Sequence, residues 1–141
     1  MIQMTNEQYY SLIHPYSDAA NLILTRLEIL NHKVYEQADA QHIHGITSRI
    51  KEKDSIEHKL KKKHSSGSPD NAKALLQDIA GIRVICFFER DIRSLTECLK
   101  KQSDLIIIKE KDYISHPKPN GYRSYHLILG VPIYYMDGME Y

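Results

Sequence analysis

Residues 111–126 hold the densest set of side chains in the sequence that could do chemistry. Two prolines and the turn dipeptide Asn120-Gly121 predict a rigid loop in this stretch. Tyr122 supplies an aromatic ring flanked by cations, an arrangement suited to stacking on a base while binding its phosphates. A plain hairpin loop is the alternative interpretation, although this density of Lys, Tyr, Arg and His is uncommon in one.

A second cluster is the basic segment 49–63, which contains seven Lys or Arg residues and three Asp or Glu residues. Seven minus three gives a local charge of +4 in a chain whose formal total is +1. Such a run is either a solvated helix face or an anion site near a helix start, where backbone N–H groups, Arg and Lys converge on phosphates.

Asp78 is a carboxylate placed at the expected end of a helix, immediately before an apolar run. Gly81 permits a tight entry into that run, and Arg83 stands within it and needs a partner. Asp78 and Arg83 therefore form a structural pair, or Asp78 holds a divalent metal while Arg83 binds a nucleotide. His42 and His44 are not interpreted as a metal site, because no third ligand is spaced to join them.

Helices are expected to carry the first half of the chain. After Pro15, with Ser17 or Asp18 as cap, apolar residues recur every three or four positions and predict an amphipathic helix; they are Ala20, Ile23, Leu27, Leu30 and Val34. The polar stretch 41–47 ends that pattern.

A second helix is expected to begin at Asp54 or Ser55, with Ile56 and Leu60 as its apolar pair. Residues 64–68 read as a flexible connector. Ser68 and Pro69 then begin a helix over 69–77, whose Leu75 and Leu76 face inward.

The second half of the chain predicts strands packed with helix. Residues 81–88 read as a strand buried on both faces, 90–101 as a helix and 105–108 as a second strand. A long strand follows Asn120-Gly121 and places Tyr125, Leu127, Leu129, Val131 and Ile133 on one face; Asp137-Gly138 then predicts a hairpin. This order indicates an α+β fold, a mixed β-sheet with packed helices.

Length and composition set the class of protein. The chain has 141 residues, of which 42% are hydrophobic and 26% charged, values that exclude a disordered or collagen-like chain. Two cysteines are too few for a disulfide framework, and neither a secretory signal nor an apolar run long enough to cross a membrane is present, so we expect a cytoplasmic protein. We expect residues 1–141 to form a single domain that is incomplete at its C-terminus, because the chain stops three residues after Asp137-Gly138.

Three motifs in the correct order resemble the RelA/SpoT-type (p)ppGpp synthetases, and most closely the single-domain small alarmone synthetases. They are Arg49-Ile-Lys51 with Ser55-Ile and Lys59, Asp78-Ile-Ala-Gly-Ile-Arg83, and Tyr113-Ile with Pro117-Lys-Pro-Asn-Gly-Tyr-Arg-Ser-Tyr-His126. The resemblance covers about residues 17–136 and implies a nucleotidyltransferase-like fold. It also implies transfer of the β,γ-pyrophosphate of ATP to the 3′-hydroxyl of GDP or GTP with Mg²⁺, a GTP pyrophosphokinase activity that makes (p)ppGpp in the stringent response.

The resemblance also implies roles for individual residues. Asp78 is the expected catalytic, metal-binding carboxylate. The ATP-side ligands are Arg49, Lys51, Lys59 and Arg83. The groups around GDP or GTP are Lys111, Lys118, Asn120, His126 and the guanine-stacking Tyr122.

One departure from the family pattern concerns a second carboxylate, which the family places on a later strand. The chain ends before that position and Glu140 is not an obvious substitute, so we expect this chain to bind nucleotides with little or no turnover. No segment resembles the family's His-Asp hydrolase domain. The alternatives are a non-catalytic nucleotide- or RNA-binding module, and a toxin-type enzyme that pyrophosphorylates tRNA. The expected partners are ATP, GDP or GTP and further copies of the chain, because the family forms tetramers, with single-stranded RNA as an optional partner and no membrane.

Overall fold

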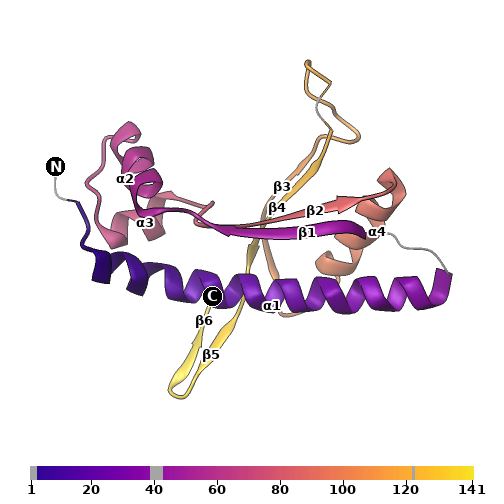
Figure 1. Ribbon diagram of the computed structural model, residues 1–141, viewed down its shortest axis with the longest axis horizontal. Helices are drawn as coiled ribbons and strands as arrows, with labels where there is room; N and C mark the ends of the chain where they lie inside the picture. Colours follow the sequence, from indigo (N-terminus) through magenta and orange to yellow (C-terminus); the bar gives the residue numbers. More distant parts are fainter. Residues whose placement is uncertain (1–2, 39–42, 122) are drawn as a thin grey trace. The chain divides into compact units, whose positions relative to one another are not determined.

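Helix α1 (Asn6–Ala38) is the longest element and runs without a break for 33 residues (Figure 1). The computed structural model describes residues 3–38, 43–121 and 123–141, and only the backbone of residues 33–38. A capping box begins α1: the Thr5 N–H donates to Gln8 Oε1 at 2.8 Å, and the Gln8 N–H donates to Thr5 Oγ1 at 3.1 Å.

The remaining elements alternate between helices and strands and confirm the predicted α+β class. In chain order they are β1 (Ile43–Ile50), α2 (Lys53–Lys62), α3 (Pro69–Leu75), β2 (Ala80–Cys86), α4 (Glu89–Lys100), β3 (Ile106–Asp112), β4 (Tyr125–Gly130), β5 (Ile133–Tyr135) and β6 (Gly138–Glu140). Within the described residues the strands pair two by two, β1 with β2, β3 with β4 and β5 with β6, and not as one mixed sheet. The last two pairs are antiparallel hairpins, which turns can close locally.

The described chain forms two compact units. The first unit comprises residues 1–25 and 46–83, and its core joins the start of α1 to α2 and α3. The buried members of that core are Met4, Leu12, Ile56, Leu60, Ala72, Leu76 and Ile79. Ile56 and Leu60 have no exposed surface, which confirms them as the apolar pair of the second helix.

The second unit comprises residues 26–45 and 84–141 and contains α4 and the two hairpins. Lys111 faces His126 and Asp112 faces Tyr125 across β3 and β4. The β5–β6 hairpin closes with Tyr135 opposite Gly138, at the turn predicted from Asp137-Gly138. Arg26 anchors this unit by donating to Asp104 Oδ1 at 2.9 Å.

Several predicted boundaries are corrected by the structure. The first helix begins at Asn6 and not after Pro15, which lies inside α1. Proline in a helix interior removes one backbone N–H and costs roughly 3 kcal/mol. Burial of Leu12 before it and of Ala20 and Ile23 after it offsets that cost.

The polar stretch 41–47 was expected only to end the helical pattern, and residues from Ile43 onward form the strand β1. Residues 39–42, and with them His42, lie outside the described residues. The side chain of Val34 lies outside them as well. The second helix begins at Lys53, and its N-cap Glu52 makes no side-chain hydrogen bond, so neither Asp54 nor Ser55 is the cap.

Ser68 and Pro69 begin α3 as predicted, since the Asn71 N–H donates to Ser68 Oγ at 3.2 Å. The helix ends at Leu75, which is 42% exposed and does not face inward, whereas Leu76 is buried.

Two strands also differ from their predictions. Residues of β2 alternate between half-buried and exposed, so the strand is not buried on both faces. The long strand after Asn120-Gly121 ends at Gly130 and resumes at Ile133, because Pro132 between them has no N–H to continue a ladder.

Candidate active site

Asp78 lies in the turn between α3 and β2, where two lysines of the first unit converge on it. Lys51 Nζ donates to Asp78 Oδ2 at 3.0 Å, and Lys59 Nζ donates to the same oxygen at 2.8 Å. Lys51 follows β1 directly and Lys59 lies on α2, one residue before the buried Leu60. These three residues, here named the Asp78 cluster, bring together three of the predicted site residues.

The electrostatics of the Asp78 cluster keep the carboxylate charged. Partial burial acts to raise the pKa of Asp78, but hydrogen bonds from Lys59 and Lys51 outweigh it and lower the pKa overall. Both lysines contact Oδ2, and Oδ1 has no hydrogen-bond or ion-pair partner among the residues described. The Asp78 side chain is 46% exposed, so the carboxylate remains accessible from solvent.

Arg83 does not pair with Asp78, so the structural Asp–Arg pair proposed as one alternative is absent from the described chain. Arg83 is the fourth residue of β2, whereas Asp78 lies in the turn before that strand. Lys51 is nearer because its N–H donates to Ile79 O at 2.7 Å, which places it beside Asp78. Arg83 on β2 and Arg49 on β1 both expose their side chains.

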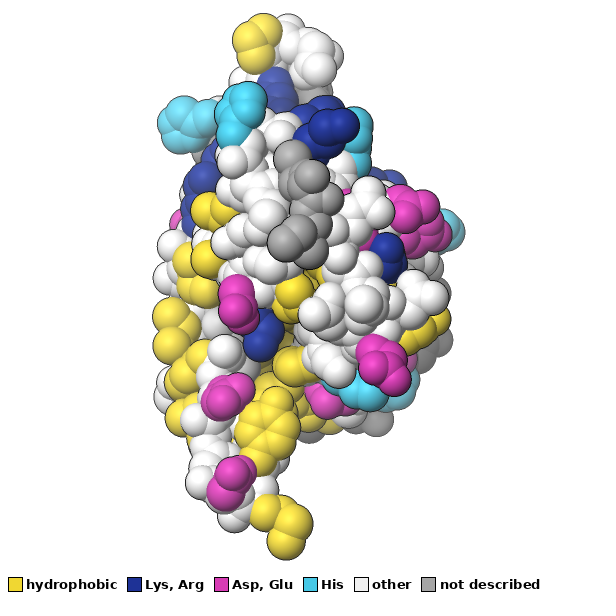
Figure 2. Space-filling view, turned by 90° about the vertical axis from the view of Figure 1, so that its left-hand side faces the viewer, with side chains coloured by type: hydrophobic (Ala, Val, Ile, Leu, Met, Phe, Trp, Pro, Cys, Tyr) yellow, Lys and Arg dark blue, Asp and Glu magenta, His cyan; other side chains and the backbone are white. Residues whose placement is uncertain are grey.

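The basic residues of segment 49–63 fall into two groups: Lys51 and Lys59 contact Asp78, and others face solvent. Lys61, Lys62 and Lys63, at the end of α2, are exposed. Figure 2 shows Lys, Arg, His, Asp and Glu side chains on the face that it presents. The solvated-face interpretation therefore holds for Lys61, Lys62 and Lys63, and the anion-site interpretation of the segment stays a prediction.

In the second unit, the ring of Tyr113 joins two predicted site residues across the loop between β3 and β4. The Lys118 ammonium lies 4.8 Å from the centre of the Tyr113 ring, within cation–π distance. The His126 ring meets the Tyr113 ring edge to face, with ring centres 5.4 Å apart. Lys111 lies opposite His126 in the strand register, so three of the predicted acceptor-side residues converge here.

Local hydrogen bonds fix the shape of this loop. Asp112 Oδ1 accepts from the Ile114 N–H and from the Ser115 N–H, both at 2.9 Å. The Gly121 N–H donates to Lys118 O at 2.9 Å and closes the turn that exposes Asn120. Gly121 has a φ of 84°, a conformation that other residues rarely adopt. Tyr122 lies outside the described residues.

The environment of His126 favours the neutral imidazole. Burial lowers its pKa, and the charges of Lys118 and Lys111 lower it further. At neutral pH the ring therefore offers one N–H donor and one acceptor among cations, a setting that an incoming phosphate would complement.

Replacing Lys118 with Met should raise the pKa of His126 toward its ordinary value of 6.5, because one of the nearby positive charges is lost. The measurement is an NMR titration of the His126 ring. Lys109→Met is the matched control, since Lys109 is exposed on β3 and lies opposite Ile128 in the register. An unchanged pKa in Lys118→Met would show that Lys118 does not act on His126.

Sequence reasoning gave no role in the site to two tyrosines. Tyr113 links Lys118 to His126, and Tyr9 of α1 donates from its hydroxyl to the Lys51 carbonyl at 2.9 Å. The 42 positions between Tyr9 and Lys51 leave no local pattern that could predict the second contact. The sequence did contain a signal for Tyr113, because this residue stands in the third motif, next to the predicted rigid loop.

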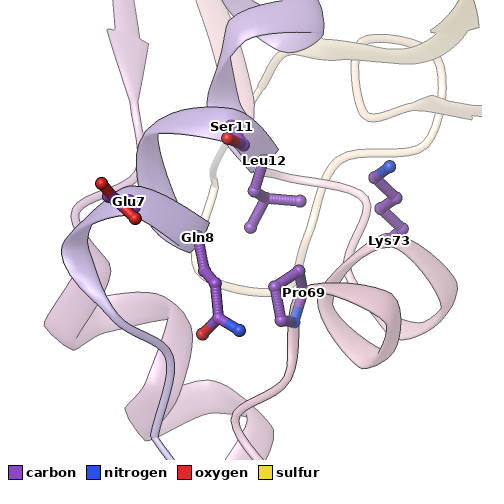
Figure 3. Close-up of a pocket in the computed structure, with 6 residues that line it drawn as sticks. All are labelled: Glu7, Gln8, Ser11, Leu12, Pro69 and Lys73. Atoms are coloured by element: carbon purple, nitrogen blue, oxygen red, sulfur yellow. The ribbon is translucent and has the colours of Figure 1, made fainter.

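A shallow pocket of about 330 Å³ lies elsewhere in the first unit. Figure 3 shows Gln8, Leu12 and Pro69 pointing toward one another within it, with Glu7 and Lys73 toward its edges. None of the predicted site residues lines it.

Two further features are absent from the described residues. No group of three or more His, Cys, Asp or Glu residues there could hold a metal ion by itself. None of the helices in the described part of the chain has the length and apolar character to cross a membrane.

Comparison with known proteins gives consistent results. A family model described as the region found in RelA / SpoT proteins matches residues 48–139. Two curated proteins of Bacillus subtilis (strain 168) are similar to the chain: GTP pyrophosphokinase YwaC, 38% identical over 89% of this chain, and GTP pyrophosphokinase YjbM, 30% identical over 98% of it. The chain spans 60% and 64% of the lengths of these two relatives.

A solved structure shares the fold. The crystal structure of small alarmone synthetase 1 from Bacillus subtilis bound to its product pppGpp has a TM-score of 0.80 and 31% sequence identity to the chain. The match covers 96% of this chain and 69% of that one. This likeness confirms the predicted synthetase fold.

Proposed function

The chain belongs to the RelA/SpoT family, and from that premise we propose that the protein is a GTP pyrophosphokinase. It transfers the β,γ-pyrophosphate of ATP to the 3′-hydroxyl of GDP or GTP and so makes (p)ppGpp, the signal of the stringent response. The observation that carries the proposal is the Asp78 cluster, an ionised carboxylate between two lysines with one oxygen left open.

The chemistry of pyrophosphoryl transfer suits this arrangement. Such transfers depend mainly on positioning and on neutralising the charge of the moving phosphates, with little covalent work for the protein. Lys51 and Lys59, which both hold Asp78, supply two ammonium groups for the donor phosphates. Arg49 and Arg83 are exposed on β1 and β2 and bind the rest of ATP.

The acceptor nucleotide binds to the loop between β3 and β4. Lys111 and Lys118 bind its phosphates, and the neutral His126 adds a hydrogen bond without adding charge. Asn120 is presented by the turn that Gly121 closes, and Tyr122 stacks on the guanine ring.

The residues of the Asp78 cluster fit Mg²⁺. This ion commonly binds through one or two carboxylates together with substrate phosphates, and Oδ1 of Asp78 is an open oxygen ligand of that type. When bound, Mg²⁺ would neutralise charge on the donor phosphates. Asp78 would hold it, and Lys51 and Lys59 would orient the carboxylate.

Four further features belong to the same proposal. Residues 1–141 belong to one synthetase-like domain, copies of the chain assemble into a homo-oligomer, the protein works in the cytoplasm, and single-stranded RNA is an optional partner. The homo-oligomer comes from the family resemblance, whereas the single domain and the cytoplasmic location come from the length and composition of the sequence.

The proposal is tested by incubating the purified protein with Mg²⁺, GDP or GTP, and ATP labelled in its γ-phosphate. In keeping with the low turnover expected from the sequence, we expect the label to move slowly to the guanine nucleotide, with AMP released in equal amount. Labelled tRNA in place of labelled (p)ppGpp would favour the toxin-type alternative. Nucleotide binding without AMP release, in the presence of both substrates, would favour a non-catalytic module.

A further inference from the structure

Lys51 occupies a junction at which its backbone carbonyl has no partner in regular structure. Strand β1 ends at Ile50 and helix α2 begins at Lys53. The first carbonyl to accept a bond from α2 is that of Glu52, to which the Ile56 N–H donates at 3.0 Å. The Lys51 carbonyl therefore belongs neither to the strand ladder nor to the helix, and a partly buried carbonyl needs another donor.

Tyr9 is that donor. Its hydroxyl lies 2.9 Å from Lys51 O, while the Lys51 N–H donates to Ile79 O at 2.7 Å. The backbone of Lys51 is thus held on one side by α1 and on the other by the residue that follows Asp78. The Tyr9 ring packs against the core that α1, α2 and α3 share, and this packing fixes the position from which the hydroxyl donates.

We infer that Tyr9 is a positioning residue for the donor half of the site: its hydroxyl fixes the Lys51 backbone so that the Lys51 ammonium meets Asp78. The inference rests on the proposed function, which gives Lys51 its role in binding ATP. Without the hydroxyl, the peptide between Lys51 and Glu52 can rotate toward water. The Lys51 side chain, which is 12% exposed, would then extend from a backbone that is no longer held in one position.

The protonation state of Tyr9 agrees with this role. Burial raises the pKa of its hydroxyl, and the neighbouring Tyr10 and Glu52 raise it further. The hydroxyl therefore keeps its proton, and its ability to donate, throughout the range in which an enzyme is assayed.

The test compares Tyr9→Phe with Tyr10→Phe. Tyr9→Phe keeps the ring and its packing and removes only the hydroxyl. Tyr10 is the matched control because it is the adjacent tyrosine on the same helix, is 60% exposed, and has no hydroxyl contact among the interactions of the described chain. Affinity for a non-hydrolysable ATP analogue and for GDP is measured by calorimetry, together with the pKa of Asp78 by NMR.

Tyr9→Phe should weaken binding of the ATP analogue about fivefold, the effect of one lost hydrogen bond, and leave the GDP affinity unchanged. The pKa of Asp78 should rise in this variant, because a loosened Lys51 stabilises the carboxylate less. Tyr10→Phe should change none of the three quantities. A purely structural role for Tyr9 would lower the melting temperature without separating the two affinities, and that result would overturn the inference.

Lys51→Ala separates failure of this inference from failure of the proposed function. If Lys51→Ala weakens ATP-analogue binding and Tyr9→Phe does not, Tyr9 is no positioning residue and the proposed function stands. If Lys51→Ala has no effect on that affinity, the donor role of Lys51 and the inference about Tyr9 both fall. A wild-type protein that binds neither nucleotide would overturn the proposed function and the inference with it.

Discussion

Asp78→Asn is expected to reduce pyrophosphoryl transfer about 100-fold or more, the size of effect that follows loss of a preorganised electrostatic contact at a reacting centre. The substitution keeps the shape of the side chain and removes its charge. Lys51 and Lys59 then have no anion to orient them, and the proposed Mg²⁺ ligand is lost. The measurement is the initial rate of labelled (p)ppGpp formation at saturating ATP and GDP.

The same variant should fold normally. Nearly half of the Asp78 side chain is exposed, so solvent screens its ion pairs and their loss should cost less than about 1 kcal/mol. The sign of the pH effect follows from the lowered pKa. Asp78 contributes stability above its ordinary pKa of 3.8, and that contribution is lost as the pH falls through the lower pKa of the folded state. The Asn variant should therefore lose less stability than the wild type on acidification.

Asp70→Asn is the control for this experiment. Asp70 is another exposed carboxylate of the first unit, in the first turn of α3, and no ion pair holds it within the described chain. It should leave the rate unchanged. If Asp78→Asn retained near-normal transfer with Mg²⁺, Asp78 would be no more than a structural partner of Lys51 and Lys59.

Features that depend on neighbouring residues were predictable from the sequence. The Ser68-Pro69 helix start rests on a hydrogen bond three residues away. The hairpin at Asp137-Gly138 rests on a turn dipeptide, and the Ile56 and Leu60 pair on one turn of helix. In each case the physical cause lies within a few residues, so the pattern in the sequence contains it.

Features decided by tertiary packing were not predictable in the same way. Pro15 reads as a helix boundary, because the cost of an internal proline is local while the burial that offsets it is spread along α1. The polar residues of β1 give no alternating pattern, because that strand is specified by its pairing with β2. Sequence alone also could not choose between Arg83 and two lysines as partners of Asp78.

The candidate site shows the same division. The basic residues that could bind phosphates, and the carboxylate of Asp78, lie in short sequence motifs and could be identified one by one. Their convergence could not, because the Lys51 backbone is fixed by Tyr9 and Ile79, which are distant in sequence. Tyr113 likewise connects the loop residue Lys118 to the strand residue His126.

Tyr122→Ala is expected to raise the KM for GDP and GTP by about 5- to 150-fold, the equivalent of the 1–3 kcal/mol that base–aromatic stacking contributes. The residues on either side of Tyr122 are held by contacts that do not involve its ring: the Gly121 N–H donates to Lys118 O at 2.9 Å, and Arg123 donates to Glu89 at 2.8 Å. The loop would therefore keep its shape without the ring, and the KM for ATP should stay as in the wild type.

Tyr122→Phe is the matched variant, because it keeps the π face and removes only the hydroxyl. If stacking is the interaction, Tyr122→Phe should retain an acceptor KM close to that of the wild type. The difference in acceptor KM between Tyr122→Ala and Tyr122→Phe then gives the contribution of the aromatic ring to binding. A comparable loss in both variants would assign the effect to a hydrogen bond from the hydroxyl. Equal acceptor KM values in Tyr122→Ala and the wild type would remove Tyr122 from the site and leave recognition of guanine to Lys111, Lys118, Asn120 and His126.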